Sequence, residues 1–221
     1  GYGLSEASPV VCINPIEGHA RPGMIGLPIS STEIALADPG TGEIYPDGGR
    51  AGERGELVVR GPQVMQGYWQ RPDETADVLT DGWLHTGDVA IMDEDGFFAI
   101  VDRKKDIIIT GGENIYPREV EEVLYAHPKV QEAVVLGVAH EVAGQVVKAY
   151  IVPRKGETLN RREILIYCQE HLAKYKVPRQ VEFRETLPKT LTGKILRRVL
   201  LEEEAARPQR RRRGGASEEE S

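Results

Sequence analysis

Residues 102–121, which read DRKKDIIITGGENIYPREVE, hold the most informative pattern of this chain. A charged cluster comes first, a β-branched run follows at 107–109, and a glycine pair precedes the helix start that Pro117 predicts. We expect the isoleucines to form a buried strand. This sequence of a charged cluster, a strand, a glycine pair and a helix start predicts a joint between two parts of the chain. Its glycine loop has a backbone that can approach a ligand closely.

The balance of charge changes at this joint. Residues 1–101 carry 5 basic and 16 acidic side chains, whereas residues 102–221 carry 23 basic and 19 acidic ones. Two solvated surfaces are the plain explanation, and a domain boundary followed by a basic domain suited to nucleotides is the sharper one. We therefore predict one domain at 1–101 and a second at 102–200. Blocks of like charge predict a disordered tail at 201–221.

Composition places the chain among globular proteins. It has 221 residues, of which 40% are hydrophobic and 29% are charged. No apolar stretch approaches the ~20 residues that span a bilayer, and no secretory signal opens the chain. Because Cys12 and Cys168 are isolated thiols, we expect a cytoplasmic protein without a structural zinc site. The missing initiator Met indicates a piece of a longer or processed protein. The arginine run at 210–213 is a weak nucleic-acid signal, and we expect no nucleic-acid partner.

The pattern of short segments predicts an α+β fold in two parts. Short β-like runs between glycine turns fill residues 8–101, which favours a mostly antiparallel sheet or open barrel. Helix, strand, strand, helix and strand then follow at 117–126, 130–138, 146–152, 160–172 and 181–183. This order favours a small domain in which helices lie on a sheet.

Two clusters in the first half carry candidate chemistry. In GYGLSE at 1–6, Tyr2 stands between glycines, and Ser5 with Glu6 offers a hydroxyl and a carboxylate for phosphate and Mg²⁺. A turn with a core tyrosine is the plain alternative. In GWLHTGD at 82–88, Asp88 follows a Thr-Gly turn and can accept both hydroxyls of a ribose. An aspartate that caps its own backbone is the alternative there.

Two more clusters lie in the second half. Arg103 offers a fork of donors for hydroxyl or phosphate oxygens, and a solvated charged turn is its alternative. In LPKTLTGKI at 187–195, a Thr-Gly turn presents Lys194 in the manner of a phosphate contact. This is not a Walker loop, because Pro188 and Ile195 stand where that motif needs Gly and Ser or Thr. A lysine that faces water at a helix start is the alternative.

Taken together, the order and spacing of the four clusters resemble the adenylate-forming superfamily, which includes acyl-CoA synthetases, coumarate-CoA ligases, luciferases and peptide-synthetase adenylation domains. The resemblance covers residues 1–200. The form GGENIYP at 111–117 is most similar to the fatty acyl-CoA synthetase branch. The resemblance implies a fold in which a β-rich part of a large AMP-binding domain is followed by a small mobile α+β domain. It also implies an acid–CoA ligase of fatty acid metabolism, which forms acyl-AMP from ATP and then a thioester with CoA.

The resemblance implies roles for individual residues. Most family members have Thr where Ser5 stands, so a hydroxyl is kept. The nucleotide would be bound by Tyr2, Gly3, Asp88 and Arg103, with Tyr2 on the adenine. Catalysis would fall to Lys194, Ser5 and Glu6, with Glu6 holding Mg²⁺, while Asp102 would be the hinge and Gly111, Gly112 and Glu113 would line the CoA channel.

The family's phosphate loop and most of its acyl pocket are not in this chain. We therefore expect these 221 residues alone to lack ligase activity. A non-catalytic remnant that binds a nucleotide or a partner is one alternative, and a ligase for aryl acids or for carrier-protein acylation is another. The expected partners are a carboxylic acid, ATP and CoA. The oligomeric state is left open, with a homodimer as one alternative.

Overall fold

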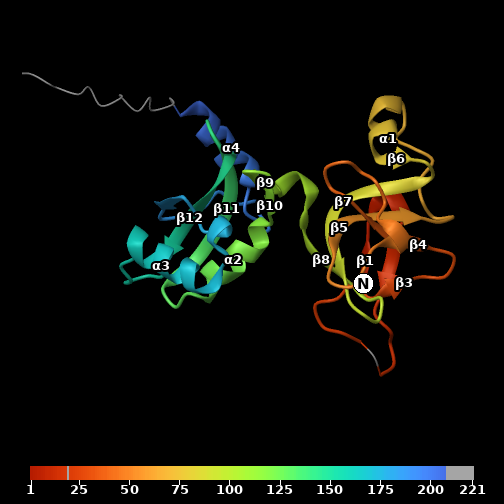
Figure 1. Ribbon diagram of the computed structural model, residues 1–221, viewed down its shortest axis with the longest axis horizontal. Helices are drawn as coiled ribbons and strands as arrows, with labels where there is room; N and C mark the ends of the chain where they lie inside the picture. The colour runs from red at the N-terminus through yellow and green to blue at the C-terminus, as the bar shows by residue number, and fades with distance from the viewer. Residues whose placement is uncertain (19, 208–221) are drawn as a thin grey trace, which may run out of the picture.

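The structure is a computed structural model that describes residues 1–18 and 20–207. Figure 1 shows two parts, joined by the chain that leaves strand β8. We call residues 1–103 the N-terminal part and residues 104–207 the C-terminal part. Within the described residues, no helix combines the length and the apolar character that a membrane crossing requires.

The N-terminal part is built from antiparallel strands, as the sequence predicts. A small sheet has the order β1-β2-β3, and a larger one has the order β4-β5-β7-β6, with β8 paired to β7. Its main core lies where apolar side chains of both sheets meet, among them Val11, Leu57 and Leu84. The strands are β1 (Tyr2–Gly3), β2 (Val10–Ile13), β3 (Leu27–Pro28), β4 (Glu33–Ala37), β5 (Arg54–Arg60), β6 (Leu79–Thr80), β7 (Trp83–Met92) and β8 (Phe98–Arg103), and the helices are η1 (Ser5–Ala7), η2 (Pro46–Gly48) and α1 (Pro72–Val78).

A bulge interrupts β7 at the Thr-Gly-Asp sequence. Val58 of β5 lies opposite His85, but Glu56 lies opposite Val89, so the register shifts by two residues. Gly87 has φ +71°, a left-handed conformation that suits glycine. The prediction of a turn before Asp88 is therefore wrong in kind, because the segment remains within a ten-residue strand. Bulges of this sort re-aim a side chain next to a site.

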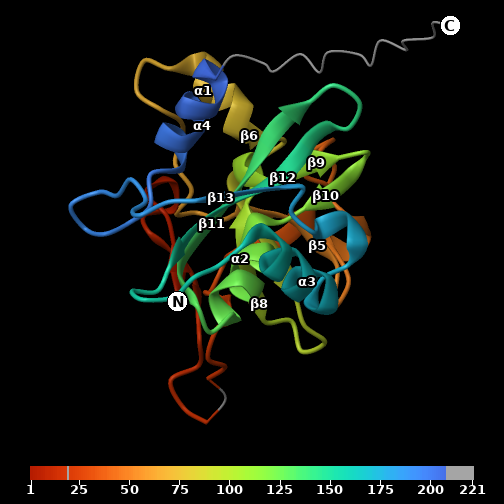
Figure 2. The same cartoon turned by 90° about the vertical axis from the view of Figure 1, so that its left-hand side faces the viewer.

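The C-terminal part is a mixed sheet with helices on both faces. The long hairpin β11–β12 is antiparallel, β13 runs parallel to β12, and β9 with β10 forms a short hairpin at one end. Figure 2 shows α2 and α3 lying side by side over one face. The elements are η3 (Lys104–Asp106), β9 (Ile108–Thr110), β10 (Glu113–Ile115), α2 (Pro117–Ala126), β11 (Val130–His140), β12 (Gly144–Pro153), α3 (Arg161–His171), η4 (Lys174–Lys176), β13 (Gln180–Phe183) and α4 (Arg197–Ala206).

Helix boundaries follow local sequence. Pro117 occupies the first turn of α2, where its missing N–H costs nothing, and His127 before Pro128 ends the helix. Asn160 caps α3 by accepting a hydrogen bond from the backbone N–H of Glu163 at 2.9 Å. The two helices predicted for this part are thus confirmed, and Asn160 is the N-cap of the second.

Alternation along β11 and β12 produces two cores. Ala133 and Val135 face α2 and α3, whereas Val134 and Leu136 face the other side, where Leu200 of α4 is fully buried. Burying a leucine stabilises by about 1.5–3 kcal/mol, which favours docking of α4 on this face.

The isoleucine run and the glycine pair form one hairpin. Ile108 is buried, but Ile109 is 55% exposed, so the prediction of a wholly buried strand is wrong. The strand belongs to a two-stranded ribbon with one face on the core, and alternate side chains therefore face outward. Gly111 and Gly112 are the two turn residues, with φ +58° and +89°. Two left-handed residues between strands give a tight hairpin turn.

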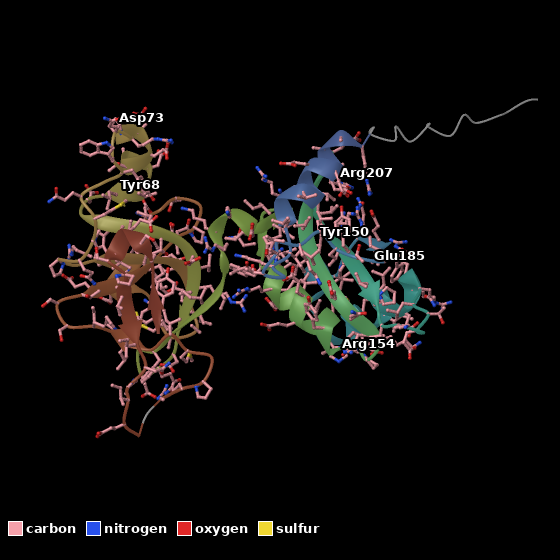
Figure 3. The ribbon with its side chains drawn as sticks, turned by 180° about the vertical axis from the view of Figure 1, so that it is seen from behind. Tyr68, Asp73, Tyr150, Arg154, Glu185 and Arg207 are labelled. Atoms are coloured by element: carbon pink, nitrogen blue, oxygen red, sulfur yellow. The ribbon has the colours of Figure 1, made fainter. Side chains whose placement is uncertain are left out.

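Helix α4 corrects the predicted start of the tail. We expected disorder from residue 201, yet residues 201–206 are helical, and residues 208–221 lie outside the described residues. The acidic block is ordered because it is paired: Glu204 accepts from Lys148 at 2.7 Å and from the Tyr150 hydroxyl at 2.6 Å. Figure 3 shows Arg207 at the end of α4, near Tyr150.

Candidate functional site

Three of the predicted residues meet around one carboxylate. Asp88 is 8% exposed, and its Oδ2 accepts a hydrogen bond of 2.7 Å from the Tyr2 hydroxyl. Its Oδ1 lies 2.8 Å from Nε of Arg103. Asp88 and Arg103 are direct partners across β7 and β8, which fixes their side chains together. We call these three residues the Asp88 cluster.

The Asp88 cluster has capacity left for a ligand. Burial and the hydrogen bond to Asp88 raise the pKa of Tyr2, so its hydroxyl stays a donor at neutral pH. A carboxylate offers about four lone-pair positions, and two are occupied here. Arg103 is more than half exposed at its side chain, so its remaining donors face outward. The cluster can therefore hold a pair of hydroxyls such as those of a ribose.

Gly3 has a packing reason to be glycine. A Cβ at this position would lie 2.2 Å from the backbone oxygen of Pro9. The small residue thus permits the close pairing of β1 and β2 that places Tyr2 beside Asp88. Its predicted contact with a nucleotide stays a prediction.

Glu6 lines a hollow next to this cluster. The hollow has a volume of about 480 Å³, and Glu6, Glu56, Tyr68 and Lys104 are among its lining residues. The Tyr68 hydroxyl donates to Oε1 of Glu6 at 2.8 Å. Within the described residues, no group of three or more His, Cys, Asp or Glu side chains gathers as a metal site. One carboxylate fits Mg²⁺, which commonly takes one or two protein ligands and otherwise phosphate and water. Ser5 lies beside Glu6 on η1 and is exposed.

Asp102 links the two parts of the chain. It is 3% exposed and lies in β8 opposite Val89. Its Oδ1 accepts from the backbone N–H of Arg103 at 2.8 Å, and its Oδ2 accepts from that of Arg118 at 2.9 Å. Arg118 is in the first turn of α2, so a carboxylate of the N-terminal part stabilises a helix start of the C-terminal part.

A second contact lies beside this joint. Arg54 of β5 reaches across to Glu119 of α2, with Nη1 and Oε2 3.0 Å apart, and its guanidinium lies 4.9 Å from the centre of the Tyr116 ring. Lys176 of η4 binds the other oxygen of Glu119. We call Arg54, Tyr116, Glu119 and Lys176 the interdomain clasp. The clasp and Asp102 both connect the N-terminal part to the C-terminal part.

Lys194 lies on an exposed loop of the C-terminal part, residues 188–196. The loop is closed by a bond from the Lys194 N–H to the Thr190 hydroxyl, and Gly193 has φ +85°. In the part of the chain that the structure describes, Nζ of Lys194 has no ion-pair partner. Gly111, Gly112 and Glu113 are also exposed, at the tip of their hairpin. Among residues 1–18 and 20–207, no hydrogen bond joins either element to the Asp88 cluster.

The sequence interpretation missed three side chains that shape these elements. Glu56 is 2% exposed and contacts the bulge of β7. Tyr68 bonds Glu6. Arg197 begins α4, donates to Glu121 at 2.7 and 2.8 Å and to the backbone oxygen of Val135 at 2.7 Å, and so fastens the base of the Lys194 loop. A basic residue three positions after Lys194 was the only local signal for Arg197. Glu56 and Tyr68 lie in the phrases GELVVRGP at 55–62 and GYW at 67–69, which also resemble the superfamily but carried no role.

Comparison with protein families matches both parts of the chain. The model for the AMP-binding enzyme matches residues 1–69, and the model for the AMP-binding enzyme C-terminal domain matches residues 119–194. A long-chain-fatty-acid–CoA ligase of Bacillus subtilis (strain 168) is 57% identical over 202 residues, which are 91% of this chain and 35% of that protein. A feruloyl-CoA synthase of an Amycolatopsis species is 49% identical over 89% of this chain and 39% of that protein.

Solved structures agree with these matches. ATP-bound MatB from Rhodopseudomonas palustris superimposes with a TM-score of 0.81 at 37% identity, over 91% of this chain and 39% of MatB. The apo form of MatB superimposes with a TM-score of 0.63 over the same shares of the two chains. The arrangement seen here is thus closer to that of the ATP-bound structure. The chain spans about a third of the length of the curated relatives it matches. The predicted resemblance and fold are confirmed, and the chain belongs to the AMP-binding, adenylate-forming enzymes.

Proposed function

We propose that this chain is part of an ATP-dependent acid–CoA ligase. The enzyme activates a carboxylic acid, in the first place a fatty acid, as acyl-AMP and then forms its thioester with CoA. The Asp88 cluster carries the proposal, because a buried carboxylate between a tyrosine and an arginine suits the sugar of AMP. Relatives that are 57% and 52% identical to this chain are named long-chain-fatty-acid–CoA ligases, and these names support the proposal of this reaction.

In the first half-reaction, an oxygen of the acid attacks the α-phosphorus of ATP, and the bond to pyrophosphate breaks. A carboxylate is ionised at neutral pH, so no general base is required. Negative charge on the phosphate oxygens is stabilised by a fixed cation, which we assign to Lys194. Ser5 contacts the phosphate, and Glu6 holds Mg²⁺, which neutralises charge on the phosphate oxygens when bound.

In the second half-reaction, the sulfur of CoA attacks the acyl carbonyl, the thiol loses its proton, and AMP leaves. We propose that the C-terminal part rotates about Asp102, which removes Lys194 and brings in the glycine hairpin. Gly111, Gly112 and Glu113 then line the channel of CoA, where the small turn residues let its chain pass near the backbone. Asp88 and Arg103 keep the ribose in both half-reactions, and Tyr2 packs on the adenine.

Two alternatives remain as proposals of lower rank. A ligase for aryl acids is favoured by the similarity to a feruloyl-CoA synthase. A non-catalytic remnant that binds a nucleotide or a partner is the second alternative. Two free buried thiols, Cys12 and Cys168, support a cytoplasmic location under each of these proposals.

The test is acid-dependent ATP–pyrophosphate exchange, followed by acyl-CoA formation, with the full-length protein that contains this chain. We expect turnover with long-chain fatty acids to exceed that with aryl acids. The reverse order supports the aryl alternative, and no exchange with any acid supports the remnant. The 221-residue chain by itself serves as the companion sample, for which we expect no exchange.

A further inference from the structure

Glu56 is a buried carboxylate beside the Asp88 cluster that has no part in the proposed reaction. It is 2% exposed, on β5. Its Oε2 accepts from Nζ of Lys104 at 2.8 Å and lies 2.9 Å from Nδ1 of His85. Its Oε1 accepts from the backbone N–H of Gly87 at 3.1 Å. We call these four residues the Glu56 cluster. A buried charge is costly unless it is paired in this way.

Two of the three partners of Glu56 lie in the segment of β7 that presents Asp88. Gly87 is the left-handed residue of the bulge, and His85 is its last regularly paired residue before the register shift. Thr86 completes the bulge by donating to the backbone oxygen of Leu57 at 2.7 Å and accepting from the Asp88 N–H at 3.1 Å. The register shift of two residues breaks the regular pairing between β7 and β5. The carboxylate of Glu56 takes the place of a backbone acceptor for the N–H of Gly87.

Glu56 also reaches the segment after β8. Lys104 directly follows Arg103, which is the residue that β8 contributes to the Asp88 cluster. Arg103 bonds Asp88 of β7, and Lys104 bonds Glu56 of β5, so two consecutive cations are each held by a carboxylate of the large sheet. Burial alone raises the pKa of Glu56, but the bonds from Lys104 and His85 outweigh it, and the pKa lies below its ordinary value. Glu56 is therefore an anion at neutral pH.

We propose that Glu56 is a positioning residue for nucleotide binding, which holds the 86–88 bulge and Lys104 so that Asp88 and Arg103 face the ribose. Glu56 acts through these residues. It lines the same hollow as Glu6, so loss of its charge acts at the wall of the site. The proposal rests on the proposed function for its kinetic consequence, but its structural consequence is independent of that function.

The structural consequence is measured on this chain without ligand. Glu56→Gln removes the charge and keeps the shape, and we expect hydrogen exchange of the Gly87 amide to accelerate by about tenfold or more. The control is Glu33→Gln, which removes an exposed carboxylate paired with Arg60 on the same sheet. Unchanged protection of Gly87 in Glu56→Gln would overturn the proposal whether or not the protein is a ligase.

The kinetic consequence is measured on the full-length protein as a double-mutant cycle. We expect Glu56→Gln to raise the KM for ATP about tenfold in the parent, with much less effect in an Asp88→Ala background, because the two act through one contact. Additive effects would overturn the proposal, as would a lowered Tm with an unchanged KM, since both indicate a structural role alone. If full-length protein forms no acyl-AMP, the proposed function fails while the amide measurement still decides the role of Glu56.

Discussion

The Asp88 cluster and the Lys194 loop differ in how firmly they are held. Asp88 is nearly buried and bonded by Tyr2 and Arg103, and its bulge is held by Glu56. Lys194 is exposed, and its loop is fixed through backbone bonds and through Arg197 at its base. Both elements carry proposed roles in one reaction, yet of the two it is the Asp88 cluster that is held together by bonds between side chains.

This difference corresponds to two functional roles in the proposed reaction. A group that binds the same part of a ligand throughout a reaction gains from being held in place by its neighbours. A group that serves one step must be able to leave, and it is therefore carried on an element with few contacts to the site. The joint at Asp102 lies between the two elements, where a carboxylate holds the start of α2 by a single hydrogen bond.

The largest expected effect is that of Lys194→Ala in the full-length protein. We expect the rate of acyl-AMP formation to fall about 100- to 1000-fold, because a cation at developing charge is lost. The measurement is ATP–pyrophosphate exchange under saturating acid. The matched control is Lys189→Ala, which removes a lysine of the same loop that pairs with Glu132, and a comparable loss there would show that the loop rather than its charge matters.

Asp88→Ala comes next and tests the fixed side of the comparison. Loss of hydrogen bonds to a charged group weakens binding by about 10- to 100-fold, and we expect this factor in the KM for ATP. Equilibrium binding of AMP gives the same quantity without turnover. Asp95→Ala, at an exposed ion pair with Arg21, is the control, and equal effects of the two changes would remove Asp88 from the ribose.

Sequence and structure agree where local signals decide. Pro117 and Asn160 marked helix starts, and β-branched runs marked most strands of both parts. The Gly-Gly pair predicts a loop when it is taken alone, and a hairpin turn when the β-like segments on both sides are considered with it.

The features that the sequence did not predict depend on contacts between segments that are distant in the sequence. Glu56 gains its role from a register in which Leu57 faces a bulge almost 30 residues later, and no local pattern reports such a register. The helix at 201–206 was missed because its charges have partners on β12 that lie over 50 residues away. Charge blocks predict disorder only when nothing pairs with them.

Arg54→Ala tests whether the interdomain clasp holds the present arrangement. An ion pair that is about one-third exposed contributes up to about 1 kcal/mol, so we expect a shift of roughly two- to fivefold in the population of arrangements. Energy transfer between dyes on α1 and α3 measures this shift. Arg50→Ala, on an exposed turn near the start of β5, is the control. An unchanged distribution would show that Asp102 alone sets the arrangement.

The last expected effect concerns the acid stability of the C-terminal part rather than the reaction. Hydrogen bonds from Arg207, Lys148 and Arg184 outweigh burial and lower the pKa of Glu182 from 4.5 to about 2. A lowered pKa in the folded state stabilises fully above about pH 4.5, and this stability is lost as pH falls towards 2. Glu182→Gln should therefore flatten the fall in unfolding free energy over that interval, as measured by urea denaturation. Glu170→Gln, on the exposed face of α3, should leave the slope as it is, and an equal slope in both variants would contradict the prediction.

Thioester formation by Lys194→Ala from supplied acyl-AMP and CoA tests the central claim most directly. The account separates a fixed nucleotide site, which serves both half-reactions, from a lysine that serves only the first. It predicts a rate within about threefold of the parent for this variant, far from the 100- to 1000-fold loss expected in acyl-AMP formation. A loss of equal size in both half-reactions would contradict the account.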